Sequence, residues 1–217
     1  MKKTIMKKNA FTMLELVFVI VVIGILAALA IPRFDRDLRQ GAKDNLLSAI
    51  RHTQALALVD NKTNPAEANW QRAFWQIRFS NPSTPNNEWV YSIGSNMDYA
   101  TSLDKNESAI DPVNGKYMYS GDASPADSDE SPNIFLTKKY GIDTVTFNDC
   151  SGSSGSTAKH IAFDNLGRLH RGVFGGENNY RTLVTNEDCI ITFGFISEGI
   201  SDLNITISQQ TGYVSAN

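Results

Sequence analysis

Residues 16–31 read LVFVIVVIGILAALAI and carry no charged side chain. Between Leu14 and Ile31, 16 of 18 residues are hydrophobic, although the 217-residue chain as a whole is only 41% hydrophobic. Counted from Phe11, the segment ends at Ile31 after 21 residues. As a helix it would be about 31 Å long, enough to cross a hydrocarbon core about 30 Å thick. The sequence therefore predicts a transmembrane helix.

Charge differs on the two sides of this segment. Lysines at positions 2, 3, 7 and 8 precede it, whereas the stretch from Arg33 to Arg39 is nearly balanced. The positive-inside rule then places the amino terminus in the cytoplasm and the remainder outside. From Arg33 onward there are 16 basic and 22 acidic residues, a net charge of −6, which favours no nucleic-acid partner.

Composition excludes several other classes. The 11 Phe, 7 Tyr and 3 Trp can build a core, which argues against disorder throughout the chain. Fifteen glycines without a period and only two cysteines exclude collagen-like and disulfide-dense proteins. No nucleophile elbow, phosphate-binding loop or zinc-protease motif is present, so the sequence does not indicate an enzyme.

Two alternatives compete with a membrane span. Ala28-Leu29-Ala30 could be a signal-peptidase site, which would release a soluble binding or adhesion domain beginning at Ile31. A buried helix in a soluble core is the weaker alternative, because a helix that is apolar all round needs a large surrounding protein.

A motif surrounds the start of the apolar segment. Lys7-Lys8-Asn9-Ala10 is followed by Phe11-Thr12-Met13-Leu14-Glu15-Leu16. With the apolar run and Pro32, this motif resembles the leader and cleavage signature of type IV pilins and type II secretion pseudopilins. The resemblance implies cleavage between Ala10 and Phe11 by a prepilin peptidase and methylation of the Phe11 amine. The family usually has Gly at the position of Ala10.

Glu15 is the charged residue inside the apolar segment. A carboxylate in a membrane is costly unless it has a partner, so Glu15 is a functional hypothesis. The resemblance implies that it pairs with the amino terminus of a neighbouring subunit during filament assembly. The alternative is that Glu15 lies at the cytoplasmic interface and stays hydrated.

The remaining pattern predicts an α+β protein. Apolar residues at helical spacing continue past Pro32, where we expect a kink, to about residue 60. The pattern predicts a transmembrane helix at 11–31, its amphipathic continuation at 32–60 and a β-rich globular head at 61–217, with the helix packed on an antiparallel sheet. The family resemblance implies in addition that residues 1–10 are a leader and that the head is periplasmic. Candidate strands are Phe74–Phe79, Trp89–Ile93, Thr144–Phe147, His160–Phe163, Cys189–Ile196, Leu203–Ser208 and Tyr213–Val214. The stretch SGSSGS at 151–156 predicts a flexible loop.

Cys150 and Cys189 both lie in the exported part, where an oxidising compartment favours a disulfide over two separately buried thiols. The histidines have no Cys or carboxylate at a zinc-like spacing, so the sequence indicates no cofactor. An acidic loop could instead bind calcium, although a solvated loop is the simpler interpretation. Its candidate residues are Asp122, Asp127, Asp129 and Glu130.

The family resemblance implies a structural subunit that is held in the inner membrane and then assembled into a filament. Its partners would be other pilin or pseudopilin subunits, the prepilin peptidase and an inner-membrane assembly platform. The segments 203–214 and 160–168 resemble the sheet of minor pseudopilins, which favours a type II secretion pseudopilus over a pilus. A DNA-uptake minor pilin is a further alternative, with Lys159, Arg168, His170 and Arg171 as a small basic patch.

Overall fold

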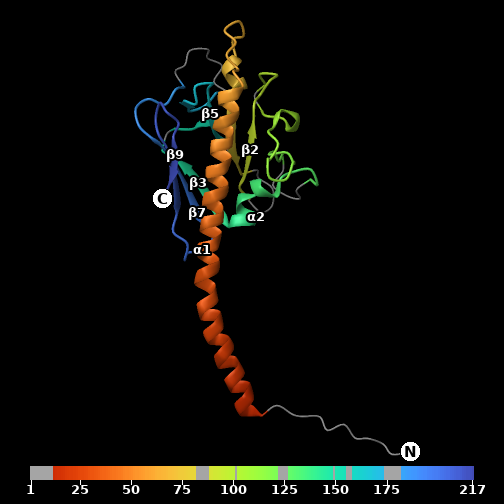
Figure 1. Ribbon diagram of the computed structural model, residues 1–217, viewed down its shortest axis with the longest axis vertical. Helices are drawn as coiled ribbons and strands as arrows, with labels where there is room; N and C mark the ends of the chain where they lie inside the picture. Colours follow the sequence, from red (N-terminus) through yellow and green to blue (C-terminus); the bar gives the residue numbers. More distant parts are fainter. Residues whose placement is uncertain are drawn as a thin grey trace, which may run out of the picture.

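A single helix forms the long axis of the molecule. The computed structural model describes residues 12–81, 88–100, 102–121, 127–148, 150–154, 158–173 and 182–217, and only the backbone at 28–36, 153, 154 and 158. Helix α1 (Met13–Val59) has 47 residues. It begins after Thr12, whose hydroxyl accepts a hydrogen bond from the Glu15 backbone N–H, which satisfies one donor of the first turn. Figure 1 shows α1 extending well below the head and curving gently there.

Helix α1 is continuous through position 32, as the apolar and amphipathic periodicity predicts. The residues on both sides of Pro32 are helical, and the kink that we expect there stays a prediction. In the upper half of α1 one face is buried, comprising Ala42, Leu46, Ala49, Ile50, Thr53 and Ala57. These positions recur every three or four residues, the spacing of a helix face that packs against a core.

A first antiparallel sheet lies against α1. Its strand order is β2 (Val90–Gly94), β1 (Trp75–Ser80), β5 (Ala158–Phe163) and β4 (Gly152–Ser154). The short β6 (Leu169–His170) pairs with β5 on the same edge as β4. On the outer edge of β2, Ile93 donates a backbone hydrogen bond to Met118 and accepts one from Ala109. This edge is therefore covered and is not an open template for another chain.

A second antiparallel sheet holds the carboxy-terminal part. Its order is β3 (Ile142–Phe147), β7 (Cys189–Phe195), β8 (Leu203–Ile207) and β9 (Val214–Ala216). Both sheets contact α1, and Figure 1 shows them behind and beside the upper half of the helix. One core joins the three layers, with Phe79 of β1 packed edge-on against Phe193 of β7 at 5.6 Å between ring centres.

Short helices connect the strands. They are η1 (Trp70–Ala73), η2 (Lys105–Glu107), η3 (Pro132–Ile134) and α2 (Leu136–Tyr140). Helix α2 ends at Gly141, which adopts φ of 70°, a left-handed conformation that glycine adopts without strain.

The predicted α+β class with antiparallel sheets is confirmed, and all seven predicted strands exist within about two residues of their expected bounds. The expectation of a flexible loop at 151–156 is wrong for Gly152–Ser154. These residues form β4 because their backbone pairs with β5 from Ala158 to His160, a partner that their own composition does not reveal.

Candidate functional site

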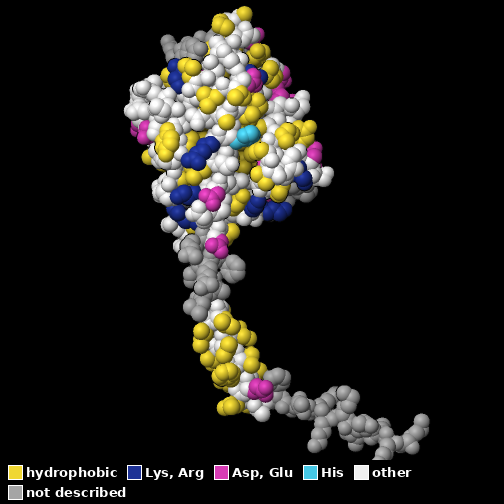
Figure 2. Space-filling model, in the orientation of Figure 1, with side chains coloured by type: hydrophobic (Ala, Val, Ile, Leu, Met, Phe, Trp, Pro, Cys, Tyr) yellow, Lys and Arg dark blue, Asp and Glu magenta, His cyan; other side chains and the backbone are white. Residues whose placement is uncertain are grey.

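The lower half of α1 carries an uncovered apolar surface. Every hydrophobic side chain of more than alanine size from Met13 to Leu26 is exposed, with fractions from 38% at Val22 to 84% at Met13. Figure 2 shows this surface as a yellow stalk below the head. A contiguous apolar surface of this kind marks a site of association with protein or lipid.

Glu15 lies within this surface, in the first turn of α1. Its side chain is exposed and shares one side of the helix with Leu14, Val17, Phe18 and Val21. The structure therefore places the predicted assembly carboxylate among apolar groups. Ala10 and Phe11, the expected cleavage and methylation positions, lie outside the described residues.

In the described part of the chain, no helix is long and apolar enough to cross a bilayer.

Polar groups join the upper half of α1 to the chain end. Arg39 donates hydrogen bonds to the carbonyl oxygens of Ser201 and Asp202, at 3.1 and 3.2 Å. The Lys43 ammonium donates to the terminal Asn217 carbonyl oxygen at 3.0 Å. Farther up, Gln54 Nε2 donates to the carbonyl oxygens of Gly167 and Gly212, at 2.8 and 3.1 Å. The upper half of α1 is therefore held to the rest of the head by these polar contacts in addition to the core.

The two cysteines form the predicted disulfide, with a Cα–Cα distance of 5.4 Å. Cys150 precedes β4 of the first sheet and Cys189 begins β7 of the second. The bond therefore connects the two sheets directly. The neighbouring Asn148 follows β3 and binds the start of β7 within the second sheet, since its side chain donates to the Asp188 carbonyl oxygen and accepts the Ile190 backbone N–H.

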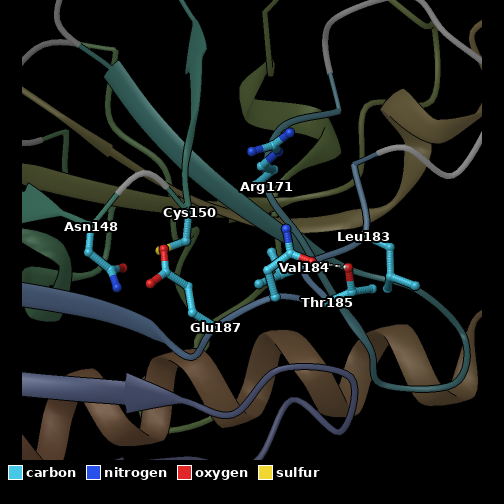
Figure 3. A pocket seen from close by; sticks show the side chains of 8 residues that line it. Asn148, Cys150, Arg171, Leu183, Val184, Thr185 and Glu187 are labelled. Atoms are coloured by element: carbon cyan, nitrogen blue, oxygen red, sulfur yellow. Dashed lines mark hydrogen bonds between the residues drawn. The ribbon is translucent and has the colours of Figure 1, made fainter.

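A polar pocket of about 180 Å³ lies beside the disulfide. Figure 3 shows its lining, in which Arg171 and Glu187 are the charged side chains. The other lining residues are Asn148, Cys150, Leu183, Val184, Thr185 and Asn186. Since Cys150 is bound in the disulfide, this lining offers no thiol nucleophile and no histidine base, and it does not resemble a group-transfer site.

The described acidic residues of the candidate calcium loop gather around an ammonium group. Lys105 Nζ lies 3.1 Å from Asp127 Oδ2, 2.7 Å from Asp129 Oδ1 and 4.0 Å from Glu130 Oε1. The Lys105 hydrogen bond lowers the pKa of Asp129, and Asp129 in turn raises the pKa of Lys105. Asp122 lies outside the described residues. Among those that are described, no cluster of His, Cys, Asp or Glu side chains is arranged to hold a metal ion.

Sequence reasoning missed a buried polar chain in the β5–β6 hairpin. Asp164 Oδ2 lies 2.6 Å from Arg168 Nη2 and 3.3 Å from His170 Nε2. His170 Nδ1 lies 2.8 Å from Thr182 Oγ1. The Asp164 pKa stays well below its usual range because hydrogen bonds from His170 and Arg168 outweigh the opposing effect of burial. The D-x-x-x-R-x-H spacing across a tight turn was the available signal.

The role of these buried polar side chains is structural. His170 is fully buried and Asp164 is 1% exposed, so neither group reaches a substrate. Asp164 Oδ1 also accepts the backbone N–H groups of Leu166 and Arg168, which fixes the turn. The same contacts remove His170 and Arg168 from the basic patch that sequence reasoning considered for DNA.

Comparison with known proteins identifies one relative among the type IV pilins. The type IV narrow pilus major component PilA5 of Thermus thermophilus is 34% identical to this chain over 110 residues, which cover 48% of this chain and 84% of that protein. No protein-family model matches the chain. No solved structure matches it. On the identity to PilA5 and the extent of that protein covered, the chain belongs to the type IV pilin family.

Proposed function

We propose that this chain is a structural subunit of a type IV pilus-type filament. The observation that carries the proposal is the exposed apolar surface of α1 between Met13 and Leu26, attached to a folded head. Apolar surface left in water costs about 25 cal/mol per Å². Lipid before assembly and neighbouring α1 helices after assembly would both remove this cost, so the same surface serves as an anchor and as a filament core.

Processing would precede assembly. A prepilin peptidase would cleave between Ala10 and Phe11, and methylation of Phe11 would follow. The subunit would then stay in the inner membrane through residues 11–31, with its acidic head in the periplasm, until an assembly platform extracts it. The exposed apolar residues and the prepilin-like motif support this order.

Glu15 would set the register of each incoming subunit. An unpaired carboxylate and an unpaired ammonium are both costly at low dielectric. A subunit that docks with its Glu15 against the Phe11 amine of a neighbour neutralises both charges together. Subunits docked one helical turn away would leave both charges unpaired, so only one register is stable.

Replacement of Glu15 by Ala tests this mechanism. We expect the variant to enter the membrane normally, because the substitution removes a charge. Its amount in sheared filaments should fall at least about tenfold. Asp44→Asn is the matched control, since Asp44 is an exposed carboxylate on the upper half of α1. Incorporation of Glu15→Ala at the level of Asp44→Asn would contradict the mechanism.

A pseudopilus of a type II secretion system is the second candidate. The resemblance of residues 203–214 and 160–168 to minor pseudopilins favours it, and the name of the relative favours a pilus. Deletion of the gene separates the two. Loss of surface filaments with normal protein secretion supports the pilus, whereas loss of secretion with filaments retained supports the pseudopilus.

A further inference from the structure

The outer face of the first sheet carries a second polar pocket, far from the apolar stalk. Side chains alternate along β1, so Ile77 and Phe79 enter the core while Arg78 and Ser80 face the other way. Residues 102–121 cover this face and enclose a pocket of about 210 Å³. Its polar lining includes Arg78, Ser80, Ser92, Asp104, Tyr119 and Ser120.

Arg78 is the cation of this pocket. It forms no ion pair with any carboxylate in the part of the chain that the structure describes, and its Nε atom is buried without a hydrogen-bond partner there. Arg51 of α1 and Arg168 of the head are placed differently, since Arg51 donates to the Val214 carbonyl oxygen and Arg168 to Asp164. Burial also lowers the pKa of Arg78, but a guanidinium stays charged at neutral pH.

The neighbours of Arg78 on the sheet do not neutralise it. In the strand register Arg78 stands between Ser92 of β2 and His160 of β5. His160 is 1% exposed, and its pKa is lowered to about 4 by burial and by Arg78 itself, so it is neutral at pH 7. Its Nε2 accepts the Val173 backbone N–H. Among the described lining residues, Arg78 therefore supplies the fixed positive charge, with hydroxyl groups and the Asp104 carboxylate around it.

Asp104 is the one acidic residue among the described residues of the lining. Its carboxylate accepts the backbone N–H of Glu107 and so caps helix η2. It opposes an anion in the pocket without pairing with Arg78. The two substitutions should therefore change the affinity for an anion in opposite directions. Removal of the Asp104 charge must strengthen anion binding, whereas removal of the Arg78 charge must weaken it.

We propose that this pocket binds a small tetrahedral oxyanion, a phosphate group, through the Arg78 guanidinium and the surrounding serine hydroxyls. Guanidinium groups bind phosphate through paired, charge-assisted N–H···O hydrogen bonds, and hydroxyl donors can satisfy the remaining oxygens. The volume is below the roughly 300–1,000 Å³ typical of drug-sized ligands. It suits a free ion or the terminal phosphate of an ester.

Titration calorimetry of the full-length chain in a non-ionic detergent tests the site with three probes at matched ionic strength. Inorganic phosphate and glycerol 2-phosphate separate a free ion from an ester. Acetate tests the geometry of the oxyanion, and we expect it to bind at least about tenfold more weakly. No heat of phosphate binding to the wild type, or acetate binding as strong as phosphate, would overturn the proposal.

Three variants locate the site. Arg78→Gln is expected to weaken phosphate binding at least about tenfold, because it removes the charge-assisted contact. Asp104→Asn retains a good helix cap and is expected to strengthen binding several-fold. Arg171→Gln, in the other polar pocket, is the matched control and should leave the affinity unchanged. Should Arg78→Gln not fold, Asp104→Asn decides alone, and binding that is unchanged or weaker in it refutes the site.

Discussion

His160 shows how one buried side chain couples the head to pH. It lies on the outer face of β5 beside Arg78 and is almost completely buried. Burial and the neighbouring guanidinium both disfavour the imidazolium, so the pKa falls to about 4 in the folded state. An unfolded chain would protonate the same imidazole near pH 6.5. Between these two values the unfolded state therefore binds more protons than the folded state.

Stability should consequently fall as the pH is lowered. The contribution of His160 is complete above about pH 6.5 and is lost as the pH decreases toward 4, amounting to about 3 kcal/mol over that range. Urea unfolding at pH 7 and pH 4.5 measures it. His160→Gln, which keeps an acceptor for the Val173 N–H, should show a smaller decrease. An equal decrease in the two proteins would show that His160 is not responsible.

Asp164 is the second residue whose charge the fold depends on. Asp164→Asn replaces the carboxylate oxygen that accepts the Leu166 and Arg168 N–H groups by an amide oxygen that can still accept them. It removes the negative charge that binds Arg168 and His170. We expect a loss of about 2 kcal/mol in the free energy of unfolding, below the roughly 3–5 kcal/mol for breaking a fully buried pair because Arg168 is partly exposed. Asp129→Asn, at an exposed ion pair, should have little effect. Equal losses in the two variants would contradict this ranking.

Among the elements, the two sheets are joined covalently by a disulfide. The Cys150–Cys189 bond closes a loop with a sequence separation of 39 residues. In the chain-entropy account, a bond that closes a loop of this size stabilises by about 3 to 4 kcal/mol. The Cys150→Ser, Cys189→Ser double variant should lose that amount in urea unfolding. It should also become insensitive to a reducing agent, whereas the wild type should respond. A wild type unaffected by reduction would contradict the account.

The loop around Lys105 gives a prediction about calcium. Since the Lys105 ammonium already contacts Asp127 and Asp129, we expect calcium and a chelator to leave the melting temperature of the wild type unchanged. Lys105→Ala removes that cation from the carboxylates, and calcium should then raise the melting temperature. Thermal unfolding with calcium and with chelator measures both. A chelator-sensitive wild type would instead favour the calcium site at this loop.

Element prediction from the sequence succeeded where a pattern is long. The helical periodicity up to Ala57 and the alternation in β1, β7 and β8 identify these elements because each buries one continuous face. It failed at β4, β6 and α2, which have between two and five residues. Elements this short are determined by partners distant in the chain. The Arg78 pocket depends on the same long-range pairing, so local patterns could not reveal it. The contact between Asp164 and His170 lies within one hairpin, and its local signal was the spacing of these residues around the turn.

The whole molecule separates two tasks along its length. The lower half of α1 is apolar and exposed, and the head, with its own core, joins the upper half through the helix face at 42–57 and the contacts of Arg39, Lys43 and Gln54. A pull on the stalk would therefore be transmitted to both sheets and to the chain end. Such a division fits the proposed filament subunit, in which the stalk would make the common core and the head the outer surface.

The amino-terminal sequence of the chain in purified filaments tests the central claim most directly. Mass spectrometry of sheared surface filaments should find this chain, without residues 1–10, beginning at an N-methylated Phe11. A chain that begins at Ile31, or one absent from filaments and recovered as a soluble protein, would contradict the assignment as a pilus subunit.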